Sequence, residues 1–110
     1  MKGNFSGHNF SFIDIETTGF SPKRGDKIIE IGIVNTDHQG NIINTYETLI
    51  NPRRDIGATW VHGISSDMVL EAPLVQDIVD DILEQIDGNV IVCPKHWENS
   101  TIGRILFSFY

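Results

Sequence analysis

Apolar and polar residues alternate in the first part of the chain with the two-residue period of a β-strand. In residues 9–15, Phe10, Phe12 and Asp14 fall on one side and the isoleucines on the other. The strand ends in a segment rich in Thr, Gly, Ser and Pro at 17–22, which predicts a loop.

Two further strands follow at short intervals. Residues 28–34 form a nearly continuous β-branched run, typical of a central strand covered on both faces. A turn is predicted at 38–41, and residues 42–50 alternate again until Asn51-Pro52 stops them. Short connections between three strands predict an antiparallel meander.

The apolar period then changes to that of a helix. A polar segment at 65–67 offers an N-cap for a short helix that Pro73 ends. Residues 74–86 carry a broad apolar stripe, and Gly88 lies where a C-cap glycine is common. Residues 90–93 read as a short buried strand. A helix that leads into such a strand predicts a crossover and a parallel pairing with the first strand.

Composition and charge narrow the class of protein. The 110 residues include 8 Lys+Arg and 15 Asp+Glu, a net charge of −7, and 40% are hydrophobic. These values predict one acidic globular domain and argue against bulk electrostatic adhesion to nucleic acid or to a membrane. A lone Cys93 excludes a disulfide framework and is interpreted as a small core residue. Without a signal peptide or a run of about 20 apolar residues, we expect a cytoplasmic protein with no membrane partner.

The sharpest candidate site is the pair Asp14 and Glu16. Residues i and i+2 of a strand project to the same face, so the two carboxylates would converge. Such carboxylates repel each other unless a cation lies between them, and Mg²⁺ and Mn²⁺ prefer oxygen ligands of this kind. The alternative is a strand end at which both acids are simply hydrated.

The sequence around this pair resembles a known family. Residues 12–20, FIDIETTGF, are similar to the first motif of the DEDD-superfamily 3′–5′ exonucleases, which include the proofreading epsilon subunit of bacterial DNA polymerase III. The resemblance continues in order through residues 26–32, 46–52 and 58–65, and it covers about residues 9–93.

The resemblance implies a fold and a reaction. The fold would be α/β, a ribonuclease-H-like mixed sheet that is incomplete at its C-terminus. The reaction would be two-metal hydrolysis of the phosphodiester bond at the 3′ end of a nucleic-acid strand, with Asp14 and Glu16 as ligands of Mg²⁺ or Mn²⁺. The implied partners are a single-stranded 3′ end and DNA polymerase or other replication and repair proteins.

Four further residues match positions that contact the substrate in the family. By resemblance, Thr17 and Thr18 would lie beside the terminal nucleotide, Phe20 would stack on its base, and His62 would reach the end of the strand. Each has a plainer alternative: a hydrogen-bonded turn for the threonines, an aromatic ring that anchors its own loop, and a surface histidine.

The chain departs from the family pattern after Cys93. Asn99 occupies the place of the third metal ligand, an Asp in relatives, although a one-residue slip would bring Glu98 there instead. The final His and Asp of the family pattern have no counterpart, since the last Asp is Asp87 and the last His is His96. We therefore expect impaired activity.

The resulting division of the chain is residues 1–93, the N-terminal part of an exonuclease domain, and residues 94–110, a divergent apolar tail of a truncated or disrupted C-terminus. The alternative function is a catalytically inactive remnant, a nucleic-acid- or protein-binding module of the same fold. An uncovered fourth strand and the tail would also allow self-association. In a third interpretation the chain is an unrelated α/β domain. Glu30 is interpreted as structural, either hydrogen-bonded or at the rim of the site.

Overall fold

The computed structural model describes residues 7–17, 28–53, 63–64 and 66–93 of the chain. Within these ranges the elements follow in the predicted order, with ends one or two residues from those expected. They are β1 (Phe10–Thr17), β2 (Ile28–Thr36), β3 (Ile42–Leu49), α2 (Ser66–Leu70), α3 (Val75–Ile86) and β4 (Val90–Val92).

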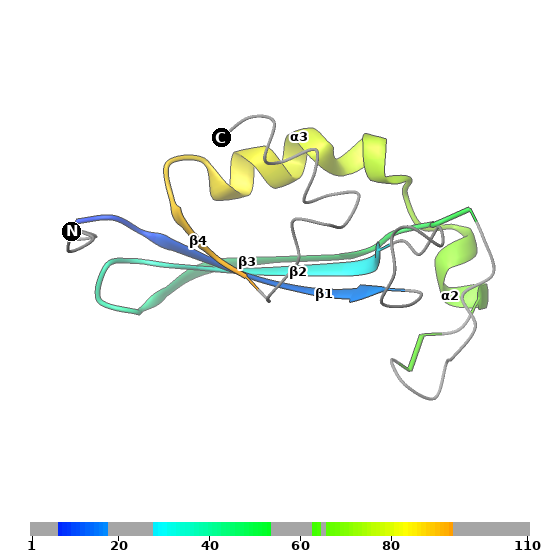
Figure 1. Cartoon of the computed structure of the whole chain (residues 1–110), viewed down its shortest axis with the longest axis horizontal. Coiled ribbons are helices and arrows are strands. Elements are labelled where there is room, and N and C mark those ends of the chain that lie inside the picture. Colours follow the sequence, from blue (N-terminus) through cyan, green and yellow to red (C-terminus); the bar gives the residue numbers. More distant parts are fainter. Residues whose placement is uncertain (1–6, 18–27, 54–62, 65, 94–110) are drawn as a thin grey trace.

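The strands form one mixed sheet in the order β3-β2-β1-β4. β1 pairs with β2 and β2 with β3 in antiparallel fashion, whereas β4 lies parallel to β1. The predicted meander and crossover are thus confirmed. Helix α3 crosses one face of the sheet, and α2 lies near the end at which β1 finishes (Figure 1).

The turn between β2 and β3 is closed by one carboxylate. Asp37 Oδ1 accepts hydrogen bonds from the backbone N–H groups of Gln39 and Asn41, both at 2.9 Å. Gly40 adopts φ +89°, which favours glycine. The hydrogen bonds from Asn41, with smaller contributions from Gln39 and His38, hold the pKa of Asp37 below its usual value. This turn sets the register in which β3 pairs with β2.

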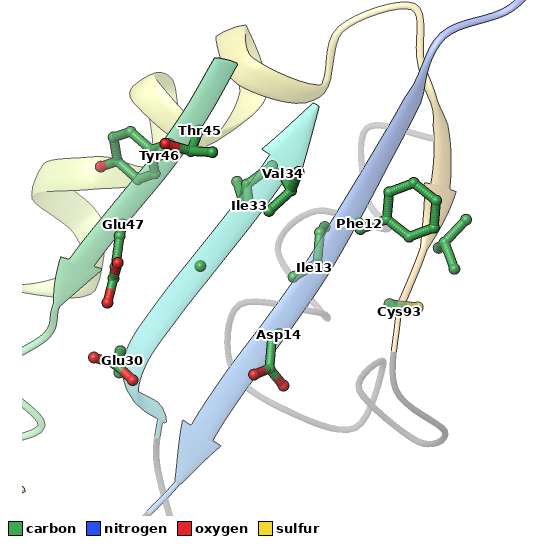
Figure 2. A pocket seen from close by; sticks show the side chains of 12 residues that line it. Phe12, Ile13, Asp14, Glu30, Ile33, Val34, Thr45, Tyr46, Glu47 and Cys93 are labelled. Carbon is green, nitrogen blue, oxygen red and sulfur yellow. The ribbon is translucent and has the colours of Figure 1, made fainter. Parts of the chain in front are cut away.

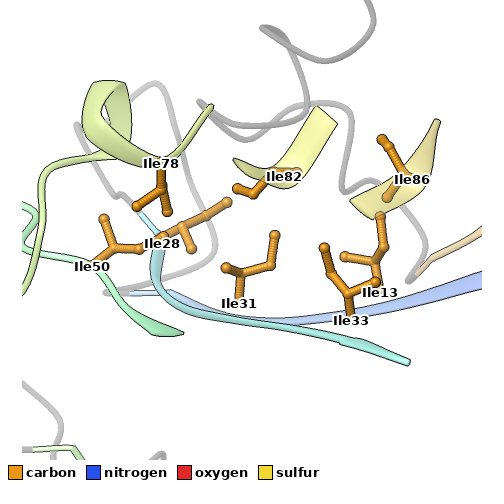
Figure 3. Packing of buried hydrophobic residues seen from close by; sticks show 8 residues of the cluster. All are labelled: Ile13, Ile28, Ile31, Ile33, Ile50, Ile78, Ile82 and Ile86. Atoms are coloured by element: carbon orange, nitrogen blue, oxygen red, sulfur yellow. The ribbon is translucent and has the colours of Figure 1, made fainter. Parts of the chain in front are cut away.

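Isoleucine dominates the core between the sheet and α3 (Figure 3). Helix α3 contributes Ile78, Ile82 and Ile86, spaced four residues apart on one face of the helix. These three side chains pack on the face of the sheet that α3 covers. The other buried members of the cluster are Ile13, Ile28, Ile31, Ile33 and Ile50.

A bulge in β2 places the adjacent residues Ile28 and Ile29 on opposite faces of the sheet. Thr17 pairs with Ile28, although its neighbour Glu16 pairs with Glu30, so Ile29 is the extra residue. The bulge restores Ile28 to the α3 side and places Ile29 in a second cluster with Ile64 and Val69 on the opposite side. β2 is therefore covered on both faces near its start, while Gly32 and Val34 are half-buried on the side away from α3.

The glycine after α3 is the signal that the sequence suggested, whereas the carboxylate at the start of the helix is an additional one. At its start the Asp77 carboxylate accepts a hydrogen bond from the Leu74 backbone N–H at 3.0 Å. After its end Gly88 adopts φ +74°, and the chain turns into β4. None of the helices in the described ranges is both long and apolar enough to cross a membrane.

The packing under α3 makes a direct prediction for stability. Ile82 is 0% exposed, whereas Ile42 on β3 is 69% exposed. Ile82→Val should lower the free energy of unfolding by about 0.5–1.5 kcal/mol, because it removes a buried methylene group. The same change at Ile42 should leave it within about 0.5 kcal/mol of the parent. Urea unfolding measures both, and equal effects would contradict this packing.

Candidate functional site

Strand β1 divides its side chains between the core and an open face. Ile13 is buried against α3, while Phe12, Asp14 and Glu16 project from the other side of the sheet. Asp14 is exposed and Glu16 is half-buried. The strand geometry thus places the two carboxylates on one face of the sheet, as the two-residue period predicted.

Neighbouring strands add two more carboxylates to this face. In the register of the sheet Asp14 lies opposite Gly32, which in turn lies opposite Glu47. One step along, Glu16 lies opposite Glu30. Like charges opposite each other on a sheet repel, so these acids store unfavourable electrostatic energy in the absence of a cation.

A hollow of about 520 Å³ lies over this part of the sheet (Figure 2). Gly32 contributes to its floor, and a Cβ atom built on Gly32 would meet nothing within 4 Å. Neither backbone strain nor packing within the described residues therefore requires glycine at this central strand position. A strand glycine without such a reason is typical of a place where a ligand or another backbone approaches closely.

The surroundings of Glu30 shift the pKa of its carboxyl group. Partial burial raises the pKa of Glu30 above its usual value of 4.5, and the charges of Glu47, Glu16 and Asp14 raise it further. Its place among these acids agrees with the interpretation of Glu30 as a residue at the rim of the site. In Figure 2 Glu30 lies on β2, the strand between those that carry Glu47 and Asp14.

The donor chemistry fits a hard divalent cation at Asp14 and Glu16. Both offer carboxylate oxygens on an accessible face, and a cation there would relieve the repulsion among the acids. Within the described ranges, however, no three His, Cys, Asp or Glu side chains are grouped so as to hold a metal ion. The described residues thus supply two of the carboxylates that such a site would need.

The far end of the hollow is apolar. Phe12 and Val92, paired between β1 and β4, are 44% and 41% exposed, and Cys93 lies beside them. The centroids of the Phe10 and Phe12 rings are 6.2 Å apart. Cys93 is half-buried and packs against the isoleucine core, as expected for a small core residue.

Of the other predicted site residues, Thr17 alone lies in the part of the chain that the structure describes. Thr17 is the last residue of β1, half-buried and paired with Ile28 beyond the bulge. Thr18, Phe20, His62 and Asn99 lie outside the described residues, as does the predicted tail, residues 94–110.

Sequence reasoning did not single out Gly32 and Glu47. Both could have been found by counting the register from the predicted turn at residues 38–41 and following the face that carries Asp14. The count itself pairs only Gly32 with Glu47; the pairing of Asp14 with Gly32 joins strands separated by residues 18–27 and cannot be counted from this turn. The bulge that pairs Thr36 with Ile42 lies at the start of β3, next to this turn, and is not visible in the sequence.

The arrangement of strands and helices identifies the fold. A solved structure described as "Exonuclease I (apo)" superimposes with a TM-score of 0.76, over 93% of this chain and 25% of that chain, at 18% sequence identity. The mixed sheet with its crossover helix is therefore the ribonuclease-H-like fold that the resemblance implied.

The sequence itself assigns the family. Residues 11–100 match the profile of the family described as Exonuclease (RNase_T), and the chain belongs to that family. It is 35% identical over 82 residues to the DNA polymerase III subunit epsilon of Rickettsia felis, covering 73% of this chain and 36% of the subunit. It is 38% identical over 85 residues to the 3′–5′ exonuclease DinG of Bacillus subtilis, covering 76% of this chain and 9% of DinG. The chain thus spans little more than a third of the first relative and less of the second.

The raised pKa of Glu30 predicts a pH-dependent effect of Glu30→Gln. As the pH falls below 4.5, Glu30 becomes protonated in both the folded and the unfolded chain, so the Tm of the variant should approach that of the parent. As the pH rises through the folded-state pKa, the parent loses stability because Glu30 must ionise while it is partly buried and lies near three other acids. The variant avoids this cost and should have the higher Tm at neutral pH.

Thermal unfolding followed by circular dichroism from pH 4 to pH 8 measures this difference. Glu84→Gln, on the exposed side of α3, is the matched control because it removes one charge away from the site. Equal changes in Tm for the two variants at every pH would contradict the electrostatic account.

Proposed function

We propose that this chain is the N-terminal part of a metal-dependent 3′–5′ exonuclease domain, a hydrolase that cleaves phosphodiester bonds at the 3′ end of single-stranded nucleic acid in the cytoplasm. The observation that supports this most is the first-motif pair Asp14 and Glu16, which stands on an accessible sheet face inside the family match. The relative DinG carries the 3′–5′ direction in its name.

Asp14 and Glu16 would hold the ions, with Mg²⁺ or Mn²⁺ as the cation. Such ions lower the pKa of a bound water and stabilise the leaving oxygen when they are present. The chain's own part is to fix two carboxylates on a rigid strand and to surround them with further negative charge from Glu30 and Glu47. That charge raises the local concentration of divalent cations.

The proposed substrate contacts extend from the end of β1. Thr17 lies one residue beyond Glu16, and we place the terminal nucleotide beside it, with Thr18, Phe20 and His62 as further contacts. The protein partner we propose is a DNA polymerase or another replication protein, because one relative is named as a subunit of DNA polymerase III. Both assignments rest on the family resemblance at those positions.

The proposal predicts loss of activity when the acid pair is neutralised. Asp14→Asn with Glu16→Gln keeps the shape of both side chains and removes two charges. We expect 3′-end degradation to fall at least about 100-fold, since even outer partners of metal ligands are typically worth 10–100-fold. A 5′-labelled single-stranded oligonucleotide with Mn²⁺ reports the products, and Mn²⁺ affinity is measured in parallel by calorimetry.

Asp80→Asn with Glu84→Gln is the control, because it removes two charges from the exposed side of α3. Cleavage that survives in the Asp14/Glu16 variant would overturn the assignment. Absence of cleavage by the parent chain, with Mn²⁺ still bound at Asp14 and Glu16, would instead support the catalytically inactive binding module.

A substitution at Asn99 tests for a gain, not a loss, of metal affinity. If Asn99 stands in the place of a third acidic ligand, Asn99→Asp should raise Mn²⁺ affinity about tenfold, because ligand charge controls affinity for hard cations. Gln76→Glu, which adds the same charge on the exposed side of α3, should leave it unchanged. An unchanged affinity in Asn99→Asp, together with a loss in Glu98→Gln, would assign the position to Glu98.

A further inference from the structure

A polar row crosses the sheet beneath the end of α3, on the side that is otherwise filled by isoleucine. Ser11, Asn35 and Asn44 lie opposite one another on β1, β2 and β3. Ser11 Oγ donates to Asn35 Oδ1 at 2.6 Å, and Asn35 Nδ2 donates to Asn44 Oδ1 at 2.8 Å. Ser11 is 0% exposed and Asn35 is 4% exposed, so these bonds replace water that the side chains cannot reach.

The same row binds the chain that leads from α3 into β4. Asn35 Nδ2 also donates to the backbone oxygen of Gln85 at 3.0 Å and, at 3.3 Å, to its side-chain oxygen. Asn89, which precedes β4, donates from Nδ2 to Ser11 Oγ at 2.9 Å. The backbone N–H of Val90 donates to the Asn9 oxygen at 2.9 Å. Asn35 is thus hydrogen-bonded, directly or through Ser11, to every other strand of the sheet or to the segment that leads into it.

Isoleucine packing alone specifies the strand register poorly. β1 presents Ile13 and Ile15 to the core, and β2 presents Ile33 and Ile31 opposite them. A slip of two residues keeps every side chain on its own face and still sets isoleucine against isoleucine. The same slip would leave the buried Asn35 amide opposite residue 9 or Ile13, without the Ser11 hydroxyl.

We propose that Asn35 is a positioning residue, which through its hydrogen bonds to Ser11, Asn44 and Gln85 fixes the register of β1 on β2 and, through Asn89, that of β4 on β1. The consequence for the site follows from the pairing. In the native register Asp14 faces Gly32, which leaves open space beside its carboxylate. A slip of two residues would set Asp14 against either the Glu30 carboxylate or the Val34 side chain.

The importance of this register for metal binding rests on the proposed function, but the register itself is measured independently. Asn35→Leu in the full chain removes the hydrogen bonds at similar volume. NMR cross-peaks between β1 and β2 report which residues face each other, and Mn²⁺-induced broadening of the Gly32 amide signal reports the position of the cation. Ile33→Val, one row away on the same strand and also buried, is the matched control.

We expect Asn35→Leu to show additional strand pairings shifted by two residues and an Mn²⁺ affinity at least tenfold below that of the parent, whereas Ile33→Val keeps the single native pairing and the parent affinity. A single native pairing with unchanged Mn²⁺ affinity in Asn35→Leu would overturn the proposal. If the parent chain fails to bind Mn²⁺, the proposed function fails, and the strand pairings alone decide the role of Asn35.

Two milder variants keep the test decisive if Asn35→Leu does not fold. Ser11→Ala removes the hydroxyl that joins Asn35 to Asn89 and leaves only the 3.5 Å hydrogen bond from Asn89 Nδ2 to Asn35 Oδ1, and Asn89→Ala removes every side-chain hydrogen bond from the segment that leads into β4. We expect the cross-peaks between Phe12 and Val92 to weaken in both variants and the β2–β3 pairings to persist. Native cross-peaks of full intensity in both would contradict the role of this row in setting register.

Discussion

The alternation of β1 is the constraint on which the rest of the structure depends. One strand must supply Ile13 to a dry core and Asp14 and Glu16 to an accessible face, and only an extended backbone separates neighbouring residues so completely. The packing of α3 on the isoleucine side holds this strand in place. That packing must also outweigh the cost of gathering acids on the other side, where partial burial and then the neighbouring carboxylates raise the pKa of Glu30.

Two irregularities in β2 adapt the sheet to this demand. The bulge at Ile29 changes which face the side chains occupy, so that the adjacent Ile28 and Ile29 contribute to different clusters, Ile28 to the core under α3 and Ile29 to the cluster with Val69. Asn35, at the other end of the same strand, interrupts the apolar lining with a hydrogen-bonded amide. Between them lies Gly32, where the absence of a side chain leaves the face open.

Much of this arrangement could be predicted from the sequence, and the reasons are local. The two-residue period of β1, the four-residue spacing of the α3 isoleucines and the turn residues around Gly40 and Gly88 each act within a few positions of the chain. The shared face of Asp14 and Glu16 followed from the same period.

The remainder depends on contacts between distant segments. The predicted second strand stopped at residue 34 and left Asn35 out, because nothing near Asn35 in sequence shows that Ser11 and Gln85 meet it. The approach of Glu47 to Glu30 depends on the β2–β3 register, which a bulge shifts. Periodicity could indicate which face a residue occupies, but not which residue lies beside it.

The turn closed by Asp37 also has a consequence for the order in which the sheet assembles. β2 and β3 are joined by a loop of a few residues, whereas Phe10 of β1 and its β4 partner Val90 are 80 positions apart. Short loops close at lower entropic cost and therefore earlier, so we expect the β2–β3 hairpin to gain protection from hydrogen exchange first and β4 last. Pulse-labelling during refolding would resolve that order. During synthesis, β1, which bears Asp14, can therefore pair with β2 before β4, its neighbour on the other side, has been made.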